Sequence, residues 1–514
     1  MAGRHTFALG CAAVFLLGAL VRLLVLWQSR DMPLFDTLIV DSRAYDLWAR
    51  RVAEGEWLRG RPFYQAPLYP YLLGIVYALV GSDAFWIRVG QCVLGGGASA
   101  LMALACRPWL ASRTALVAGV MMALYAPAVF FDGLIQKAAL DSILVPLVLW
   151  ALGSANARGG AARWLLAGAA MGVAALSRET MLLMALVIVP WVALGWRPEA
   201  GGAHGRRSGW IAAACMAAGV MLGVSPAHLH NVYHGAPLAV TTTNAGLSFY
   251  LGNGAPANGT YVPLREGRGD TRFEETDTVE LAEQGAGRAL SAQEVSAWWM
   301  GRALTDIGAD PVRWLRLVAR KAALTVNRIE MIDTDDIYLN EGYSVLLRAL
   351  NSAWNFGLLL PLACVGLVLT VHRRRSLAPL YLAVAANALA LVVFYVVARY
   401  RYPMALLLLP FAAAALTHLS RATLPRAAGA ALAGLALAWL PVTDKNAQLS
   451  ASYFNVANTL AEDGRHADAA RFFEMTHETG RRDAPLFVNH AALLTATGRT
   501  DEAAALAREG LALH

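Results

Sequence analysis

Apolar stretches of about 20 residues recur along this chain and limit it to one class of fold. Two clear examples are residues 7–27 and 354–371. A helix of about 20 apolar residues crosses the hydrocarbon core of a bilayer, which is about 30 Å thick. A water-soluble fold cannot bury so many such segments, and only 15% of the 514 residues are charged, against about 25% in soluble domains. The sequence therefore predicts an all-α, polytopic membrane protein.

We expect about eleven transmembrane helices. The first apolar segment is too long for the core of a signal peptide, and no small-residue cleavage site follows it, so we expect an uncleaved helix. The predicted spans lie near residues 7–27, 84–106, 113–131, 134–153, 162–177, 180–196, 209–226, 353–371, 377–398, 402–419 and 426–441.

Basic residues between these segments predict the orientation of the chain. Cytoplasmic loops of membrane proteins are enriched in Lys and Arg, so we place the basic loops inside and the tail outside. These loops contain Arg4; Arg107 and Arg113; Arg158 and Arg163; Arg197, Arg206 and Arg207; Arg373–Arg375; and Arg421 and Arg426. The net charge of +7 is explained by the Arg residues of these inner loops. We therefore expect no nucleic-acid partner. In a bacterium the location would be the inner (cytoplasmic) membrane, with the tail in the periplasm.

One short apolar segment, residues 68–80, tests this orientation. Apolar runs of about 10–14 residues are more often re-entrant or interfacial than spanning. Counting this segment as a span would invert every later helix and place the basic loops outside. We therefore expect it to dip into the outer membrane surface.

The spans divide the chain into four parts. We expect a membrane module at residues 1–227, which includes a first external loop at 28–83, a large external loop at 228–352, further membrane helices at 353–441 and a tail at 442–514. In the tail, Gly464 and Gly498 lie 34 residues apart, and Leu460 and Leu494 keep this offset. A 34-residue period predicts tetratricopeptide-like helical hairpins. Two repeats are few for an independent stack, so the tail should pack on the membrane domain or bind a protein partner.

The first external loop contains a candidate acid–base residue, Asp41. Asp41 stands at a predicted helix N-cap, and Tyr45, Trp48 and Val52 follow on one face at helical spacing. This pattern predicts a helix on the membrane surface, with its aromatic rings at the depth of the lipid headgroups. On spacing alone, a purely capping role for Asp41 is the favoured explanation of its position.

Cations from separate helices gather at the predicted outer boundary, where cations are normally scarce. Such a cluster favours an anionic ligand, and a lipid-linked phosphate is the natural candidate. Simpler explanations are an ion pair between Lys137 and Asp141, four residues apart on one helix, and anchoring of Arg178 at the headgroups. The candidate phosphate ligands are Arg88, Lys137, Arg178, Arg399 and Arg401.

The large external loop offers weaker signals. Tyr250 and Asn253 lie among Gly and Asn turns that suit a carbohydrate or peptide pocket, although turn chemistry alone also explains them. An acidic patch could hold a hard cation, with helix capping and solvation as the alternative. This patch consists of Glu330, Asp333, Asp335 and Asp336. Elsewhere, Gly168 and Gly172 form a small-xxx-small pair typical of helix packing.

The order of several motifs resembles the dolichyl-phosphate-mannose–protein mannosyltransferase family. Its bacterial relatives include aminoarabinose transferases that act on lipid A, and the similarity to the bacterial branch with tetratricopeptide tails covers about residues 7–440. The motifs are Asp41 with Tyr45, Pro67-Leu68-Tyr69-Pro70-Tyr71, Gly133-Leu134-Ile135-Gln136-Lys137, Leu176-Ser177-Arg178-Glu179, Phe249-Tyr250-Leu251-Gly252-Asn253 and Arg399-Tyr400-Arg401-Tyr402-Pro403.

This resemblance implies the C-type glycosyltransferase superfold and a polyprenyl-phosphate sugar donor. An acidic residue of the first outer loop is the general base in that family, and Asp41 occupies its position. Many relatives carry a second acidic residue beside it, whereas this chain has Ser42, so Asp41 is expected to be a lone carboxylate. The cations would bind the donor phosphate, Tyr45, Tyr69, Tyr250 and Asn253 would line the donor or acceptor pocket, and the segment 68–80 would guide the lipid chain.

Under this hypothesis the enzyme transfers a hexose or pentose, with inversion, to a hydroxyl of an envelope glycan, lipid or protein. No cofactor is expected to be required, because the lipid phosphate is itself a good leaving group. A divalent metal is allowed by the acidic patch but has no support in any complete ligand motif. The alternative is a non-catalytic transporter of lipid-linked saccharides, or an envelope-assembly scaffold that recruits partners through its tail.

Overall fold

The computed structural model describes residues 2–195, 206–265 and 268–513, and every regular element within these ranges is a helix. The predicted all-α class is confirmed. Of the predicted inner-loop residues, Arg197 and the side chains of Arg206 and Arg207 lie outside what is described.

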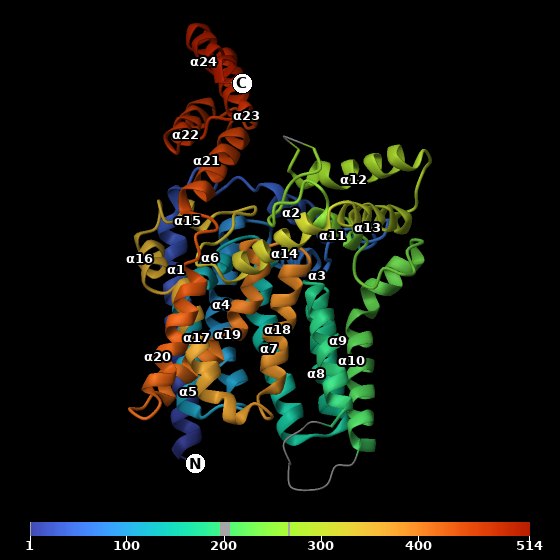
Figure 1. Ribbon diagram of the computed structural model, residues 1–514, viewed down its shortest axis with the longest axis vertical. Coiled ribbons are helices and arrows are strands. Elements are labelled where there is room, and N and C mark those ends of the chain that lie inside the picture. Colours follow the sequence, from blue (N-terminus) through green and yellow to red (C-terminus); the bar gives the residue numbers. More distant parts are fainter. Residues whose placement is uncertain (1, 196–205, 266–267, 514) are drawn as a thin grey trace.

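Long apolar helices form an upright bundle (Figure 1). Six helices in the described ranges are long and apolar enough to cross a membrane, or seven when the bent pair α5 and α6 is one span, and the shorter α8, α9, α18 and α20 are also apolar. The number of spans stays a prediction. The bundle consists of α1 (Ala2–Gln28), α4 (Ala84–Cys106), α5 (Ser112–Leu124), α6 (Ala126–Asp132), α7 (Ala138–Arg158), α8 (Ala161–Ala175), α9 (Thr180–Ala193), α10 (Arg206–Tyr233), α17 (Phe356–Thr370), α18 (Ala378–Val393), α19 (Ala398–His418) and α20 (Leu424–Ala438).

The outward surface of the bundle is apolar. On α1, the exposed side chains Leu9, Leu16, Leu20 and Leu24 lie on one face, at spacings of four or seven residues. A soluble protein would bury such a row, whereas lipid tails accept it. This surface supports a location within the bilayer.

The two ends of the bundle differ. The end that carries the tail, called the tail side here, also carries most of the loop helices (Figure 1). The helices alternate in direction, so the basic loops after α4, α7, α17 and α19 lie at the opposite end, near the N-terminus. The 3-10 helix η2 (Val371–Arg373) belongs to that opposite end. The tail-side elements are η1 (Ser29–Asp31), α2 (Val40–Ala53), α3 (Leu68–Val80), α11 (Ala245–Asn253), α12 (Thr271–Ala286), α13 (Ala292–Ala309), α14 (Pro311–Val326), α15 (Ile337–Asn340) and α16 (Val345–Ala353).

A break between α5 and α6 brings the chain into the site. The two helices meet at an angle of 59°, and Tyr125 between them has an extended backbone. Pro127 at the start of α6 has no N–H for the carbonyl oxygen of Ala123, four residues earlier, and its ring would collide with that oxygen in a continuous helix, which explains why α5 cannot continue straight. The short α6 ends at Asp132, and an irregular loop then leads to Lys137.

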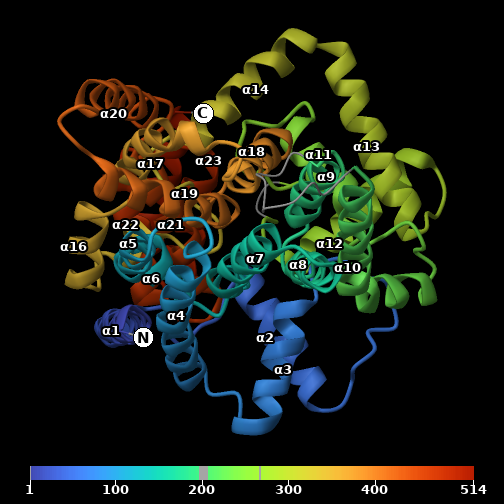
Figure 2. The ribbon, with the colours of Figure 1, turned by 90° about the horizontal axis from the view of Figure 1, so that it is seen from below.

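Helices α2 and α3 pack against each other on the tail side (Figure 2). The 13-residue α3 is about 20 Å long, too short to cross the bilayer upright, which supports the predicted dipping arrangement. Two predictions about α2 are wrong. Asp41 is the second residue of the helix and not its N-cap, which is Ile39. Tyr45, Trp48 and Val52 are buried inside the protein and do not face the headgroups, because α3 and the neighbouring loops cover that face.

Close contact between α8 and α10 explains the glycine pair of the sequence. An added Cβ atom at Gly168 would lie 1.9 Å from the carbonyl oxygen of Met216, and one at Gly172 would lie 2.4 Å from that of Val220. On α10, Gly219 and Gly223 approach α8 in the same way. Glycines spaced by four residues on both helices let the two backbones touch.

The tail forms two consecutive helix pairs that dock on the tail side. They are α21 (Lys445–Glu462) with α22 (His466–Glu478), and α23 (Ala484–Ala496) with α24 (Thr500–Leu513). Leu34 and Ile39 of the membrane module and Leu339 of the large loop share one buried cluster with tail residues such as Leu460 and Phe472. The tail therefore packs on the membrane module, while its tetratricopeptide character stays a prediction.

Candidate active site

A single large cavity on the tail side joins the membrane module, the large loop and the tail. Its volume is about 1410 Å³. The candidate residues Asp41, Tyr45, Lys137, Arg178 and Arg399 all line it, although they come from four separate regions of the sequence. These five residues are the ones that the fold brings together.

Asp41 lies at the centre of an ion-pair network. Its Oδ2 pairs with Nη1 of Arg399, and its Oδ1 accepts a hydrogen bond of 3.1 Å from Nε2 of Gln65. Arg399 also pairs through Nε with Oδ2 of Asp333. The expectation of a lone carboxylate is therefore corrected, because Asp333 of the large loop faces Asp41 across one guanidinium.

The two carboxyls of this network have different proton affinities. Burial alone would raise the pKa of Asp41, but the Arg399 guanidinium beside it holds that pKa below its ordinary value. Burial raises the pKa of Asp333, with Arg399 opposing the shift. Asp41 is therefore an ionised acceptor for a proton, and pairs of carboxyls with diverging pKa values are typical of acid–base sites. Beside Asp41, Val40 has a φ of 47°, a strained conformation for a β-branched residue.

The cations of the cavity differ in their partners. Arg178 donates through Nε (2.9 Å) and Nη2 (2.5 Å) to Oδ2 of Asp141, and both side chains are buried. Asp141 thus pairs with Arg178 and not with Lys137, contrary to the simpler explanation of the sequence. Among the described residues, no carboxylate lies within ion-pair distance of Lys137, whose side chain faces the cavity. Lys137 is therefore available to an anionic ligand without first breaking an ion pair.

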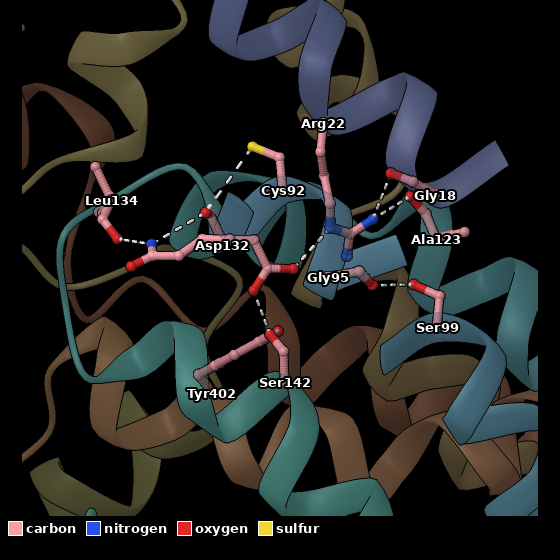
Figure 3. A network of polar contacts seen from close by, with 11 residues as sticks. Gly18, Arg22, Cys92, Gly95, Ser99, Ala123, Asp132, Leu134, Ser142 and Tyr402 are labelled. Atoms are coloured by element: carbon pink, nitrogen blue, oxygen red, sulfur yellow. Dashed lines mark hydrogen bonds and ion pairs between the residues drawn. The ribbon is translucent and has the colours of Figure 1, made fainter. Parts of the chain in front are cut away.

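A buried polar network holds the loop that presents Lys137 (Figure 3). Arg22 of α1 and Asp132 at the end of α6 point toward each other, with Nε and Oδ2 2.7 Å apart. Ser142 of α7 donates to Oδ1 of Asp132 at 2.6 Å and also contacts the hydroxyl of Tyr402. Gln91 fixes the start of the loop by donating to the carbonyl oxygen of Leu134 at 2.5 Å. The network joins α1, α4, α6, α7 and α19 around residues 133–137.

The large loop adds a carboxylate and a tyrosine to the cavity. Glu274 of α12 accepts hydrogen bonds from the hydroxyls of Tyr64 (2.9 Å) and Tyr261 (2.7 Å). Burial raises the pKa of Glu274, and the two hydroxyls oppose that shift. Glu274 and Tyr261 line the same cavity as Asp41, so they extend the polar surface available to a ligand.

Two predicted phosphate ligands have structural contacts instead and do not line the cavity. Arg401 is buried, pairs with Glu330 at 2.7 Å and contacts main-chain oxygens of the segment 324–329. Arg88 donates to the carbonyl oxygen of Phe35 at 2.6 Å, and its guanidinium lies over that ring. Arg401 points away from the cavity because Arg399 lies only two residues earlier on the same helix, on a different face.

Three predicted pocket residues also lie outside the cavity lining. Tyr69 is buried beside Tyr45 and donates to Gln91. Tyr250 packs on Trp299. Asn253 contacts Val393, Trp314 and the buried Lys321, so it ties α11 to α14 and α18. Their roles are in packing, and α3 likewise contributes no side chain to the cavity.

The acidic patch that could hold a metal ion does not form a metal site in the part of the chain that the structure describes. No group of three or more His, Cys, Asp or Glu side chains suited to a metal is found in the described ranges. Within the acidic patch, Glu330 pairs with Arg401, Asp333 pairs with Arg399, and Asp336 caps α15. Burial raises the pKa of Asp335 to about 6.

Several residues of the cavity and of the buried polar network were not predicted from the sequence. Glu274, Tyr261 and Gln65 carry no local signal, since only the tertiary fold brings them to Asp41. Arg22 did carry one, because an ionisable residue inside an apolar span usually has a partner and a role. Its partner, Asp132, is 110 residues away.

The fold and site define a multi-span helical membrane protein with a cavity at one end of its bundle that is lined by carboxylates and cations. Comparison with protein families shows that residues 64–226 match the family described as dolichyl-phosphate-mannose-protein mannosyltransferase. This match covers Lys137 and Arg178 but ends before the large loop, and it supports part of the resemblance expected over residues 7–440. No curated protein matches the chain.

Solved structures of one archaeal protein are similar to the chain. The oligosaccharyltransferase AglB from Archaeoglobus fulgidus, in complex with an inhibitory peptide and a dolichol-phosphate, has 15% sequence identity and a TM-score of 0.45. The similarity covers 88% of this chain and 58% of the archaeal chain. Its apo form gives a TM-score of 0.46 at 15% identity, with the same coverage. This chain therefore spans less than two thirds of the length of the archaeal protein.

Proposed function

We propose that this protein is a membrane glycosyltransferase of the C-type superfold, which moves a sugar from a polyprenyl-phosphate donor to an acceptor hydroxyl. One observation carries the proposal: an ionised carboxylate, Asp41, shares a cavity with Lys137, a cation that forms no ion pair with any residue that the structure describes. The family match over residues 64–226 supports the same class. The basic loops at the opposite end support a cavity that faces the exterior, or the periplasm in a bacterium.

In the proposed reaction, the acceptor oxygen attacks the anomeric carbon while its proton passes to the carboxylate of Asp41. The bond between that carbon and the phosphate oxygen breaks, and the electron pair leaves with the polyprenyl phosphate. Lys137 stabilises the charge that grows on the phosphate, and Arg178, which lines the same cavity, adds to the positive potential. Attack opposite the leaving group inverts the configuration at the anomeric carbon.

The lipid chain of the donor has an apolar route to this position. Leu182 and Leu183 of α9, with Ala390 and Leu391 of α18, line the cavity beside the charged residues. Helix α3, which we first expected to guide the lipid, presents its exposed Leu72, Leu79 and Val80 outward. We therefore assign the lipid chain to the α9–α18 side.

The test uses purified full-length protein and a labelled polyprenyl-phosphate sugar. We expect Asp41→Asn to lower the rate of transfer by about 10²–10⁴-fold, the usual contribution of a general base. Asp36→Asn, an exposed aspartate of the same loop, is the matched control and should transfer normally. A folded Asp41→Asn protein with normal transfer would exclude the catalytic role.

The phosphate site is tested by two substitutions of Lys137. Lys137→Met removes the charge but keeps the length of the side chain, and it should raise the KM for donor about tenfold or more. Lys137→Arg keeps the charge and should retain most of the donor affinity. Donor binding without any transfer by the wild-type protein would instead favour the lipid-linked saccharide transporter or scaffold.

A further inference from the structure

We propose that the tail is the acceptor-binding part of this protein, and that the acceptor is a polypeptide bound in an extended conformation along α21 and α23. This inference rests on the proposed function, because it assigns the second substrate of the same cavity. It also gives the tail a role beyond packing on the membrane module.

The cavity continues without interruption from Asp41 to the tail. On α21 its lining includes Ala451, Asn455 and Asn458, and on α23 it includes Asn489 and Ala492. These positions recur every three or four residues on each helix, so one face of each helix is turned to the cavity. A ligand lying along this surface can therefore reach the acid–base residues while still contacting the tail.

The chemistry of this surface favours a peptide main chain. Each of Asn455, Asn458 and Asn489 offers a carboxamide, which carries the same donor and acceptor types as a peptide bond. Alanines beside them leave room for a backbone to approach. Nδ2 of Asn489 already donates to Oδ1 of Asn458 at 2.9 Å, which links the two helices through one amide pair.

Carboxamides also hydrogen-bond to sugar hydroxyls, so a carbohydrate site would be distinguished by free aromatic faces and unpaired carboxylates beside them. The described tail residues of the cavity include no Trp or Tyr. Of the two Phe rings, Phe454 lies under the guanidinium of Arg481 and Phe473 is buried. The tail carboxylate of the lining, Glu462, pairs with Arg272 of α12 at 3.1 Å.

The tail is held firmly enough to orient a ligand. Lys445 pairs with Glu341 at 2.6 Å, and the hydroxyl of Ser452 donates to Asp336 at 2.5 Å. Ile332, next to Asp333, donates its main-chain N–H to Gln448 at 2.7 Å. These contacts fix α21 relative to the acid–base residues before any ligand binds, which lowers the entropic cost of binding.

The experiment measures peptide binding to the purified full-length protein without donor. The probe is a fluorescent peptide of about eight Gly, Ala, Ser and Thr residues, which extends over about 26 Å, close to the length of the 18-residue α21. A labelled linear oligosaccharide of similar length is the second probe. We expect the peptide to bind and the oligosaccharide to bind at least about tenfold more weakly.

Two tryptophan substitutions on α23 locate the site. Ala492→Trp fills the face turned to the cavity and should weaken peptide binding at least about tenfold. Val488→Trp, at a position that is 64% exposed and outside the cavity lining, should bind the peptide like the wild-type protein. Asn455→Leu, at an exposed position, removes one carboxamide and keeps a side chain of similar size. It should therefore weaken peptide binding through the lost hydrogen bonds and not by blocking the cavity.

The outcomes separate this inference from the proposed function. Absent peptide binding, tighter oligosaccharide binding, or equal binding by Ala492→Trp and Val488→Trp would overturn it. Because the assay contains no donor, peptide binding on the predicted face would stand even if Asp41→Asn transferred sugar normally. Sugar transfer to a glycan with no peptide binding would overturn this inference and leave the proposed function intact.

Discussion

At the scale of single residues, the partner of each buried cation decides what that cation can do. Arg401 has a carboxylate and main-chain oxygens within reach, and Arg178 has Asp141. Arg399 bridges Asp41 and Asp333. Lys137 faces the cavity and has no such partner within the described part of the chain. An added anion would therefore meet Lys137 first, whereas Arg401 is committed to holding the fold.

This distinction predicts opposite effects on stability. Arg401→Met leaves Glu330 buried without its partner, which costs about 3–5 kcal/mol, so we expect a clearly lower melting temperature in detergent. Lys137→Met breaks no ion pair and should melt close to the wild-type temperature. The double variant Arg401→Met with Glu330→Gln should regain part of the loss, and an unchanged melting temperature of Arg401→Met alone would contradict the structural role.

At the scale of elements, α8 and α10 depend on glycine for their close approach. A Cβ atom at Gly172 would lie 2.4 Å from a main-chain oxygen of α10, so the helices would have to separate. We expect Gly172→Ala to lower the free energy of unfolding by about 1–3 kcal/mol, as measured by thermal unfolding. Gly97→Ala on α4 is the matched control, since nothing lies within 4 Å of its Cβ position, and it should be neutral or stabilising by about 0.5–1 kcal/mol.

The helix pairs of the tail contain a buried histidine that makes their stability depend on pH. Burial lowers the pKa of His490 to about 4, with the nearby His477 adding to the shift. An unfolded chain would bind a proton near pH 6.5, so between pH 6.5 and 4 the unfolded tail holds more protons. The tail is therefore fully stable above pH 6.5 and loses on the order of 2 kcal/mol as the pH falls to 4.

Limited proteolysis of the full-length protein across this pH range checks the effect. Cleavage within α22–α24 should accelerate as the pH falls from 7 to 4 in the wild type. His490→Phe keeps a flat ring against Phe473, which stacks on His490 with a centroid distance of 5.1 Å, and should remove most of the dependence. A wild-type profile that stays flat would show that His490 does not control tail stability.

At the scale of the whole molecule, the asymmetry of charge along the bundle predicts its orientation. The loops after α4, α7, α17 and α19 carry the basic residues, and the tail and cavity lie at the other end. In a cysteine-free background, we expect Ala467→Cys to react with a membrane-impermeant maleimide on intact cells and Arg158→Cys to be protected. Both positions are exposed, so access depends on the membrane side alone, and the reverse pattern would invert the topology.

Local sequence features predicted most of the helices. All eleven predicted spans fall on bundle helices, and the segment 68–80 coincides with α3. The start of α2 was predicted less well, because Asp41 looked like a cap while its carboxylate is in fact held by Gln65 and Arg399. Five of the predicted site residues line one cavity, and their roles stay predictions; they are Asp41, Tyr45, Lys137, Arg178 and Arg399.

The sequence alone determined that this protein is helical and membrane-embedded, since the length and hydrophobicity of a segment are properties of neighbouring residues. It did not determine which charges meet. Asp41 and Arg399 are 358 positions apart, and Arg22 and Asp132 are 110 apart. Burying a charge is costly unless an opposite charge is close, so each buried charge needs a partner. The packing of the helices decides which partner that is. The same packing places the tail over the cavity.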